Sequence, residues 1–239
     1  MLRHDKNYDK EGKLIGKLSG GLMCMLLEEE RKIVIKTAIK AQNSGLVPLT
    51  FGNFSIRDQK TGYVCITPSG IDYQDLQPQD IVVIDIEGKI IEGAKRPSVE
   101  TPMHCHIYKK RPDVFGICHT HSTFATAWAS CEESMPVIVA ELAALIGGRV
   151  ETAPYRPIGS IALAEVTAKV LADKAAVLMS NHGLVAVGPD LASAFCNAVI
   201  VEESAKVTFY AKNLGKIKVI SEAECEAVKK WASEKYGQK

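Results

Sequence analysis

His119 and His121 stand one residue apart and directly follow a short apolar run at Val114-Phe115. The run predicts a strand over 114–121, and alternate residues of a strand point to the same face of a sheet. The two imidazoles would then point the same way, with Cys118 pointing to the opposite face. Imidazole nitrogens are common ligands of zinc and other transition metals. The pair is therefore half of a candidate metal site, and the rest of the chain must supply the other half.

The chain has six histidines, and the other four are His4, His104, His106 and His182. His104 and His106 form a second His-x-His, but the sequence predicts a helix there, from Pro97-Ser98 to about Lys110. Residues two apart on a helix lie about 200° apart around its axis, so this pair cannot hold one ion. We expect His106 to be a solvated surface residue. His104 follows Glu100 by one helical turn, and it either orients that carboxylate or lies satisfied in the core.

His182 belongs to Asn181-His182-Gly183, between strands predicted at 176–180 and 184–187. A side chain at a strand end beside a glycine turn is well placed for function, because a rigid element positions it. Taken alone, however, such a histidine is more often structural. Glu100, taken alone, is expected to be a helix N-terminal carboxylate stabilised by the helix dipole. Sequence spacing does not show that these two groups meet the His119/His121 pair.

Composition bounds the class of protein. The length of 239 residues allows one sizeable core or two small domains, and 46% of the residues are apolar and 24% charged. The net charge of +1 gives no overall field that would attract nucleic acid or anionic membranes. The longest apolar run, 22–27, is too short to cross a bilayer. Seven cysteines without a Cys-x-x-Cys pair suit reduced thiols. We expect a soluble cytoplasmic protein that binds neither nucleic acid nor membranes.

The predicted organisation is a flexible N-terminal extension over 1–22 and a single α/β domain over 23–239. Hairpin-length connections favour a three-layer α/β/α fold with a central, mostly antiparallel sheet. The predicted helices cover about 23–43, 97–110, 123–130, 141–146, 161–172, 190–213 and 222–234. The predicted strands cover about 51–57, 62–67, 80–86, 90–91, 114–121, 137–139, 150–152, 176–180 and 184–187. Ser122 and Asp190 are expected N-caps, and Glu202 is expected to pair with Lys206 four residues later.

Three segments in this order resemble the signature of the class II zinc aldolase/epimerase family: Pro97-Ser98-Val99-Glu100, His119-Thr120-His121-Ser122 and Asn181-His182-Gly183. The resemblance runs from about residue 28 to the closing Tyr236-Gly237-Gln238. The family includes L-fuculose-1-phosphate aldolase and L-ribulose-5-phosphate 4-epimerase. The resemblance implies one zinc ion per subunit, with manganese or cobalt as other possible metals. Its implied ligands are His119, His121, His182 and Glu100, and Glu100 would also act as an acid/base during turnover.

The same resemblance implies a phosphate site and a further catalytic group. The implied phosphate-binding residues are Gly52, Asn53, Ser69, Gly70, Ser98 and Val99. Each of these, taken alone, is also ordinary turn or capping chemistry, and Val99 stands where many relatives have a second serine. Tyr236 matches a C-terminal tyrosine that serves the family as a proton donor and is ordered by a neighbouring subunit. The resemblance thus implies a homotetramer with active sites at subunit interfaces.

The choice of reaction depends on the segment after the histidine pair. The sequence is more similar to the epimerase branch of the family, but Ala144 stands where the epimerase has an aspartate. The tyrosine that the fuculose aldolase has near Ala140 is also missing. Glu141 resembles the catalytic glutamate of methylthioribulose-1-phosphate dehydratase, and it is equally a helix N-terminal carboxylate. We therefore expect an aldolase that cleaves a ketose 1-phosphate to dihydroxyacetone phosphate and a short aldehyde through a metal-stabilised enediolate. The alternatives are the epimerase, a dehydratase-like lyase and a catalytically silent binding or scaffold member.

Overall fold

The computed structural model describes residues 25–131 and 134–235. The extension predicted over 1–22 and the predicted proton donor Tyr236 lie outside the described residues. The helices are α1 (Glu28–Asn43), α2 (Thr101–Lys110), α3 (Thr123–Ala129), α4 (Ala140–Leu145), α5 (Ile161–Leu171), α6 (Leu191–Leu214) and α7 (Glu222–Lys235). The strands are β1 (Gly52–Arg57), β2 (Val64–Ile66), β3 (Val82–Ile84), β4 (Ile90–Glu92), β5 (Gly116–Thr120), β6 (Thr152–Ala153), β7 (Ala176–Met179) and β8 (Gly183–Gly188).

The strands form one sheet of eight, in the order β4-β3-β2-β1-β5-β8-β7-β6. Every neighbouring pair is antiparallel except β6 and β7, which are parallel. The strands at the centre of this order are β1 and β5, and β5 pairs with β1 on one side and β8 on the other. The mostly antiparallel sheet is confirmed. The strand that carries the histidine pair is thus held by hydrogen bonds along both edges.

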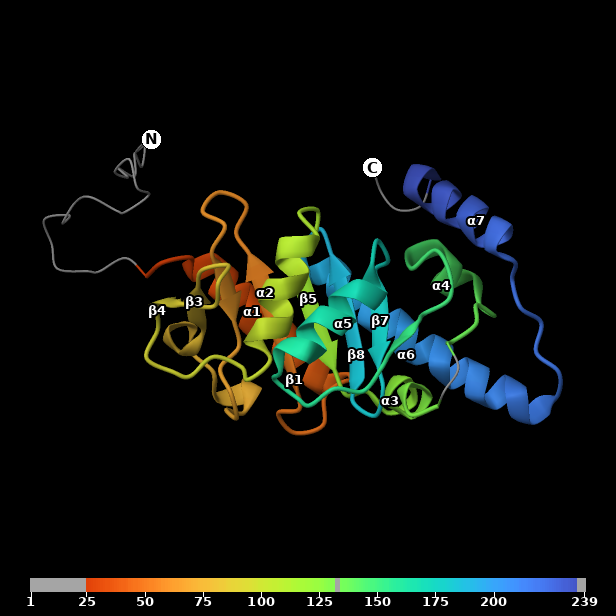
Figure 1. The fold of residues 1–239 in the computed structure, drawn as a ribbon, viewed down its shortest axis with the longest axis horizontal. Coiled ribbons are helices and arrows are strands. Elements are labelled where there is room, and N and C mark those ends of the chain that lie inside the picture. The colour runs from red at the N-terminus through yellow and green to blue at the C-terminus, as the bar shows by residue number, and fades with distance from the viewer. Residues whose placement is uncertain (1–24, 132–133, 236–239) are drawn as a thin grey trace, which may run out of the picture.

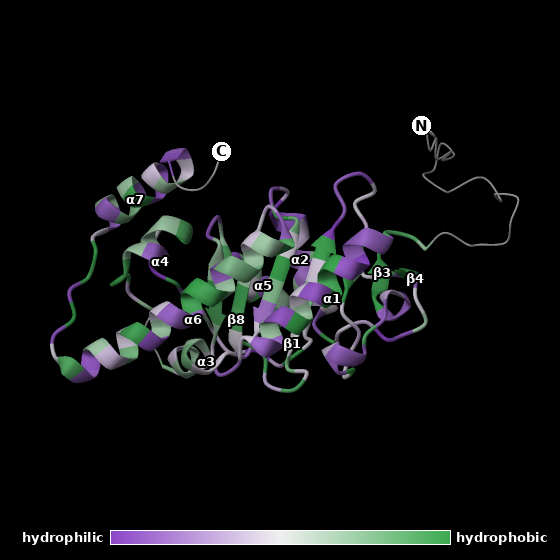
Figure 2. Cartoon of the chain, turned by 180° about the vertical axis from the view of Figure 1, so that it is seen from behind, coloured by the Kyte–Doolittle hydropathy of each residue, from purple (hydrophilic) through white to green (hydrophobic). Residues whose placement is uncertain are grey.

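Helices cover both faces of the sheet, as the three-layer prediction requires. One core contains Val34 of α1, Ala125 of α3 and Val201 of α6. The second core contains Met103 of α2 and Leu163 of α5. Figure 1 shows α2 and α5 in front of the strands, with α6 passing behind them. Figure 2 shows hydrophobic colour concentrated in the strands, whereas much of the hydrophilic colour lies on α1 and the surface loops.

Several helix ends match their sequence signals. Asp190 caps α6, because its Oδ1 accepts a 2.6 Å hydrogen bond from the Ser193 N–H. Ser122 is the N-cap residue of α3, as predicted, but its side chain accepts no hydrogen bond there. The N–H groups of Phe124 and Ala125 donate instead to the carboxylate of Glu202, at 3.0 and 2.7 Å. The predicted Glu202–Lys206 pair is therefore wrong, because α6 turns this carboxylate toward the start of α3.

Three further features differ from the predictions. The strand expected at 137–139 does not form, because the Val137 carbonyl meets one backbone donor, Ile220, and no neighbouring strand within the described ranges extends the pairing. The helix expected from Pro97-Ser98 begins at Thr101, because the Ser98 N–H donates to Thr67 and keeps that segment extended. The first helix likewise begins at Glu28 rather than near residue 23.

Within 25–131 and 134–235, no helix combines the length and the apolar character needed to cross a lipid bilayer.

Candidate metal centre

His119 is held in place by both neighbours of β5. Its side chain lies on the α2 side of the sheet, with Ile117, while Cys118 between them lies in the core on the α6 side. It is fully buried. Its Nδ1 lies 2.9 Å from the carbonyl oxygen of Leu184 in β8. Because a carbonyl only accepts, Nδ1 carries the proton, and Nε2 is left to face the interior of the site.

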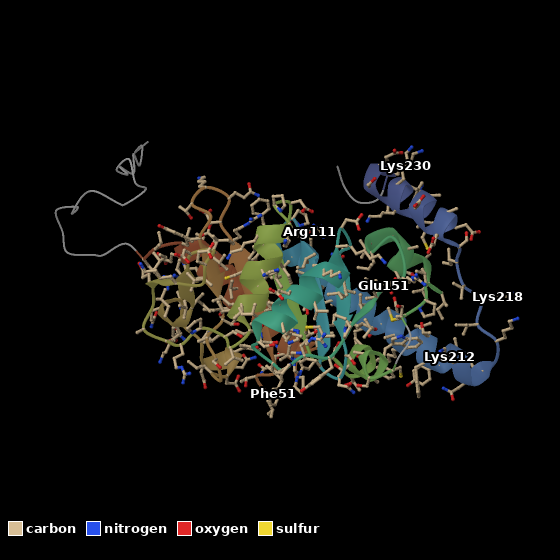
Figure 3. The ribbon with its side chains drawn as sticks, in the orientation of Figure 1. Phe51, Arg111, Glu151, Lys212, Lys218 and Lys230 are labelled. Carbon is tan, nitrogen blue, oxygen red and sulfur yellow. The ribbon has the colours of Figure 1, made fainter. Side chains whose placement is uncertain are left out.

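His121 follows the last residue of β5 on the same face. Its ring stacks on Phe51, with ring centroids 6.0 Å apart and planes 22° from parallel. Phe51 is 56% exposed, and Figure 3 shows it at the edge of the molecule where its side chain points outward. The predicted convergence of His119 and His121 on one face is borne out by their Nε2 atoms, which lie 2.9 Å apart.

His182 is aimed by the tight turn between β7 and β8. Asn181 has a positive φ of 54°, a conformation that asparagine tolerates better than most residues, and its N–H donates to Ala129. The next strand begins at Gly183, where an added Cβ would lie 2.4 Å from the carbonyl oxygen of Thr120. The glycine therefore allows β8 to approach β5 closely enough to bring His182 beside His119, with ring centroids 5.0 Å apart.

Glu100 enters the site from the residue just before α2. It is 4% exposed, and its Oε2 accepts a 2.9 Å hydrogen bond from the Asn53 side-chain amide. Oε2 also lies 2.9 Å from His119 Nε2, and Oε1 lies 3.4 Å from His182 Nε2. The ligand atoms of Glu100, His119, His121 and His182 all lie within 4.8 Å of one another. The structure thus brings together the four residues that the sequence singled out.

The buried polar atoms of this cluster fit a metal cation. Glu100 Oε1 and both ring nitrogens of His182 are buried and make no hydrogen bond with any described residue. His119 Nε2, once Nδ1 carries the proton, presents a lone pair to a carboxylate oxygen and to another imidazole nitrogen at 2.9 Å each. Such acceptors repel one another unless a positive charge lies among them. Three imidazoles and one carboxylate are a donor set that zinc and similar divalent ions accept.

The acid–base properties of the cluster agree with a need for one positive charge. Burial raises the pKa of Glu100, but His119, His182 and the Asn53 hydrogen bond outweigh burial and hold it well below its usual value. Burial lowers the pKa of His119, but Glu100 outweighs it and leaves the pKa raised. Burial and the neighbouring His119 lower the pKa of His121 to about 3 and that of His182 to about 4. Those two imidazoles therefore stay neutral, which is the form that binds metals.

Four of the six predicted phosphate-binding residues, Ser69, Gly70, Ser98 and Val99, lie in two loops near the cluster. Ser69 and Ser98 donate their N–H groups to the carbonyls of Arg96 and Thr67. The N–H groups of Gly70 and Val99 make no hydrogen bond with the described residues, and both residues are exposed. Gly70 has a φ of +71°, which suits glycine, and Val99 is 57% exposed. These two backbone donors are therefore free to bind an anionic group.

The other two predicted phosphate residues have structural roles in this chain. An added Cβ at Gly52 would lie 2.8 Å from the His119 carbonyl oxygen, so glycine permits the close pairing of β1 and β5. The Asn53 side chain is buried between Glu100 and His104 and bonds to both. Phosphate binding by Gly52 and Asn53 stays a prediction.

Glu141, the predicted catalytic glutamate, does not join the four ligands within one chain. It is exposed in the first turn of α4. It is absent from the group of residues whose ligand atoms come together, Glu100, His119, His121 and His182. A catalytic role for Glu141 stays a prediction, and Tyr236 lies outside the described residues.

His104 is satisfied in the core, which is one of the two outcomes expected for it. It is fully buried and bonds to Asn53, which in turn bonds to Glu100. The sequence signal for this contact is the alternation of side chains along β1, which places Asn53 and Ser55 on the same face of the sheet. The contact of Phe51 with His121 is not foreseen from the sequence, although Phe51 directly precedes Gly52 in a segment predicted as a strand.

Comparisons with known proteins place the chain among sugar-phosphate aldolases and their relatives. The Class II Aldolase and Adducin N-terminal domain matches residues 32–209. A protein from Bacillus thuringiensis serovar kurstaki named 5-deoxy-D-ribulose 1-phosphate aldolase is 38% identical over 214 residues, which are 90% of this chain and 100% of that protein. A solved L-fuculose 1-phosphate aldolase has a TM-score of 0.85 at 35% identity, over 87% of this chain and 98% of its own. The L-fuculose-1-phosphate aldolase from Thermus thermophilus has a TM-score of 0.69 at 26% identity, over 77% of this chain and 94% of its own.

Proposed function

Because the chain belongs to the class II aldolase and adducin N-terminal domain family, we propose that it is a metal-dependent aldolase acting on a ketose 1-phosphate. The products would be dihydroxyacetone phosphate and a short aldehyde. The observation that carries the proposal is the buried cluster of Glu100, His119, His121 and His182, whose ligand atoms lie within 4.8 Å of one another. A member that had become a silent scaffold would have no reason to keep four mutually repelling acceptors buried together.

Zinc is the metal that this donor set favours, with manganese and cobalt as the other possibilities. When bound, such an ion would supply Lewis-acid stabilisation of the negative charge that develops on the enediolate oxygens. The protein would contribute the orientation of its ligands. Leu184 fixes the His119 ring through Nδ1, and Asn53 holds one oxygen of Glu100.

The chain's own acid–base groups would move two protons. In the cleavage direction a base removes the proton from the hydroxyl on carbon 4 of the ketose, and the bond between carbons 3 and 4 breaks to release the aldehyde. A proton then returns to carbon 3 and gives dihydroxyacetone phosphate. Glu100 is the group proposed for carbon 3, because its Oε1 is buried and makes no hydrogen bond with any described residue. Tyr236 is the group proposed for the oxygen on carbon 4.

The free N–H groups of Gly70 and Val99 support phosphate binding at the loops beside α2. Backbone donors in such turns form anion-binding concavities. Ser69 and Ser98 can add hydroxyls, and Ser98 is largely buried with its Oγ accepting from the Glu100 N–H. Gly52 and Asn53 complete the proposed set of substrate-binding residues, in addition to their structural roles in β1.

The assembly proposed for this enzyme is a homotetramer with active sites at subunit interfaces. Large apolar side chains are exposed along the chain: Leu49, Tyr155, Phe209, Tyr210 and Leu214. Figure 1 shows α6 extending beyond the sheet, so its last turns are available to another subunit. A neighbouring subunit is also the route by which Glu141 or Tyr236 could reach a metal centre.

A cytoplasmic location is part of the same proposal, and it is supported by the absence of disulfides among the six cysteines within the described ranges.

A coupled assay for triose phosphate release tests the proposed reaction. The substrates are 5-deoxy-D-ribulose 1-phosphate and L-fuculose 1-phosphate, after the names of two relatives, with L-ribulose 5-phosphate as control. We expect metal-dependent release of dihydroxyacetone phosphate from at least one ketose 1-phosphate. Conversion of L-ribulose 5-phosphate to D-xylulose 5-phosphate without triose phosphate would replace the aldolase by the epimerase. A folded protein without a tightly bound divalent ion would favour the scaffold.

A further inference from the structure

A row of five buried polar side chains links the interior of the α2–sheet interface to the metal cluster. It contains Tyr108, Ser55, His104, Asn53 and Glu100, and none of them is more than 5% exposed. Tyr108 Oη lies 2.8 Å from Ser55 Oγ, which lies 2.7 Å from His104 Nδ1. His104 Nε2 lies 2.6 Å from Asn53 Oδ1, and Asn53 Nδ2 lies 2.9 Å from Glu100 Oε2. Each side chain thus contacts the next within hydrogen-bond distance.

The chemistry of the last partner fixes the direction of every bond in this row. A carboxylate oxygen accepts, and Asn53 turns its NH₂ toward Glu100 Oε2, with its Nδ2 at 2.9 Å. Asn53 Oδ1 then accepts from His104, which places the imidazole proton on Nε2. His104 Nδ1 therefore accepts from the Ser55 hydroxyl. Ser55 Oγ then has no proton left for Tyr108, so Tyr108 is the donor in that contact and shares its one hydroxyl proton between Ser55 Oγ and the Ser55 carbonyl. All four contacts therefore donate toward the carboxylate.

This row cannot conduct protons to solvent. An amide passes a proton along only by becoming its high-energy imidic acid tautomer, and Asn53 stands between His104 and Glu100. The far end is closed as well, because Tyr108 is 1% exposed and its Oη is within reach of the Ser55 carbonyl at 3.1 Å. Burial, with a smaller contribution from His119, lowers the pKa of His104 to about 3, so the ring stays neutral and keeps a single N–H. The row can therefore orient groups but cannot exchange protons with water.

We infer that His104 is a positioning residue of the metal centre, which locks the Asn53 amide so that it holds Glu100 by Oε2 and leaves Oε1 directed toward His182. Without the His104 donor, Asn53 could rotate by 180° and present its Oδ1 to the carboxylate. Two facing acceptors would then push Glu100 away from its place beside His119. The inference rests on the proposed function for the presence of a metal, but the direction of the hydrogen bonds does not depend on it.

Metal affinity tests the inference without any activity measurement. Zinc affinity is measured by chelator competition for the full-length wild type, His104→Leu and His104→Gln. Glutamine can donate from Nε2 to Asn53 and leucine cannot. We expect His104→Leu to weaken zinc binding by about 10–100-fold, as partners of metal ligands do, and His104→Gln to restore most of it. Equal affinity in leucine and glutamine variants would overturn the inference, because volume alone would then matter.

Matched variants separate positioning from stability. Ser55→Ala removes one hydroxyl of the row, and Thr167→Val removes an equally buried hydroxyl of α5 that has no partner among the described residues. We expect Ser55→Ala to weaken zinc binding about threefold, less than a direct partner of a ligand would. Thr167→Val should leave zinc binding unchanged. If His104→Leu does not fold, unchanged zinc affinity in Ser55→Ala would still overturn the inference.

The protonation state of His104 gives a second readout that needs neither metal nor substrate. In protein labelled with ¹⁵N-histidine, two-bond ¹H–¹⁵N correlations report which ring nitrogen carries the proton, and the signal missing from His104→Gln assigns the ring. We expect a neutral ring protonated at Nε2, and a ring protonated at Nδ1 would overturn the inference. If the wild type binds zinc but releases no triose phosphate, the proposed reaction fails while the positioning role stands. If no metal binds at all, the proposed function fails. The tautomer of His104 then tests on its own whether the hydrogen bonds of the row donate toward Glu100.

Discussion

The chain carries the pattern His-x-His twice, and the two copies have opposite outcomes. His119 and His121 end a strand, so their Nε2 atoms lie 2.9 Å apart beside Glu100. His104 and His106 lie on α2, where His104 is fully buried against β1 and His106 is half-buried in a groove between α2 and α5. The backbone period, and not the residue types, decides which pair of histidines can bind the same metal ion. The helical pair still contributes, because its buried member supports the site of the other pair.

The largest effect is expected when the strand pair is broken. His121→Ala removes one of three imidazoles, so we expect zinc affinity to fall by more than the ~10–100-fold typical of residues behind the ligands. Aldolase activity should fall to background at the same time. Metal analysis of purified protein and the coupled assay measure the two effects. Near-stoichiometric zinc in a folded His121→Ala protein would exclude the assigned ligand set.

Glu100→Gln keeps the shape of the fourth ligand of the strand pair's site while removing its charge and its basicity. Because proton transfer by a positioned carboxylate contributes about 10²–10⁴-fold, kcat should fall by that amount with zinc held at saturation. The measurement is kcat at several zinc concentrations. A loss of activity that added zinc fully repairs would mean that Glu100 only binds metal and moves no proton.

Gly183→Ala tests whether the close approach of β8 to β5 positions the strand pair with His182. The new Cβ would lie 2.4 Å from the Thr120 carbonyl oxygen, so the strands must separate. Overpacking of this kind costs about 1–3 kcal/mol in the free energy of unfolding. Denaturant titration measures that change. Gly148→Ala is the matched control, since its Cβ would meet nothing within 4 Å, and a loss as large as that of Gly183→Ala would argue against the steric reason.

His106→Ala should have the smallest effect of the four. His106 lies with Lys110 and Glu165 in an open groove between α2 and α5, and it is absent from the four-residue cluster. Surface substitutions of this type change stability by about 0.5 kcal/mol or less. Zinc affinity, activity and the unfolding midpoint should therefore match the wild type. A loss of zinc in this variant would mean that the helical pair also binds metal, although the helix separates its two side chains.

Sequence reasoning is most successful where local pattern decides the outcome. Strand alternation places His119 and His121 on one face, and the helical period separates His104 from His106. The three-layer arrangement also follows from the short connections between apolar strands. The meeting of Glu100 and His182 with the strand pair needs the family resemblance, because contacts between segments so far apart in the chain leave no local signal.

The misses share a physical cause. The sequence does not predict the contacts of Asn53, whose amide is shared between Glu100 and His104, residues about fifty positions away. Local spacing pairs Glu202 with Lys206 on its own helix, yet Glu202 accepts the N–H groups at the start of α3. In both cases tertiary packing gives a polar side chain a stronger partner than the nearest one along the sequence. Such choices depend on the assembled fold, so local periodicity does not report them.

The convergence of the four ligands has a consequence for measurements of stability. Glu100, His119 and His182 come from segments that only the folded chain brings together, so an ion that they share binds the native state in preference to the unfolded one. At a free zinc concentration 100 times Kd, this linkage would add about 2.7 kcal/mol to the free energy of unfolding. The melting temperature of this protein would then be a function of the zinc buffer as well as of its packing.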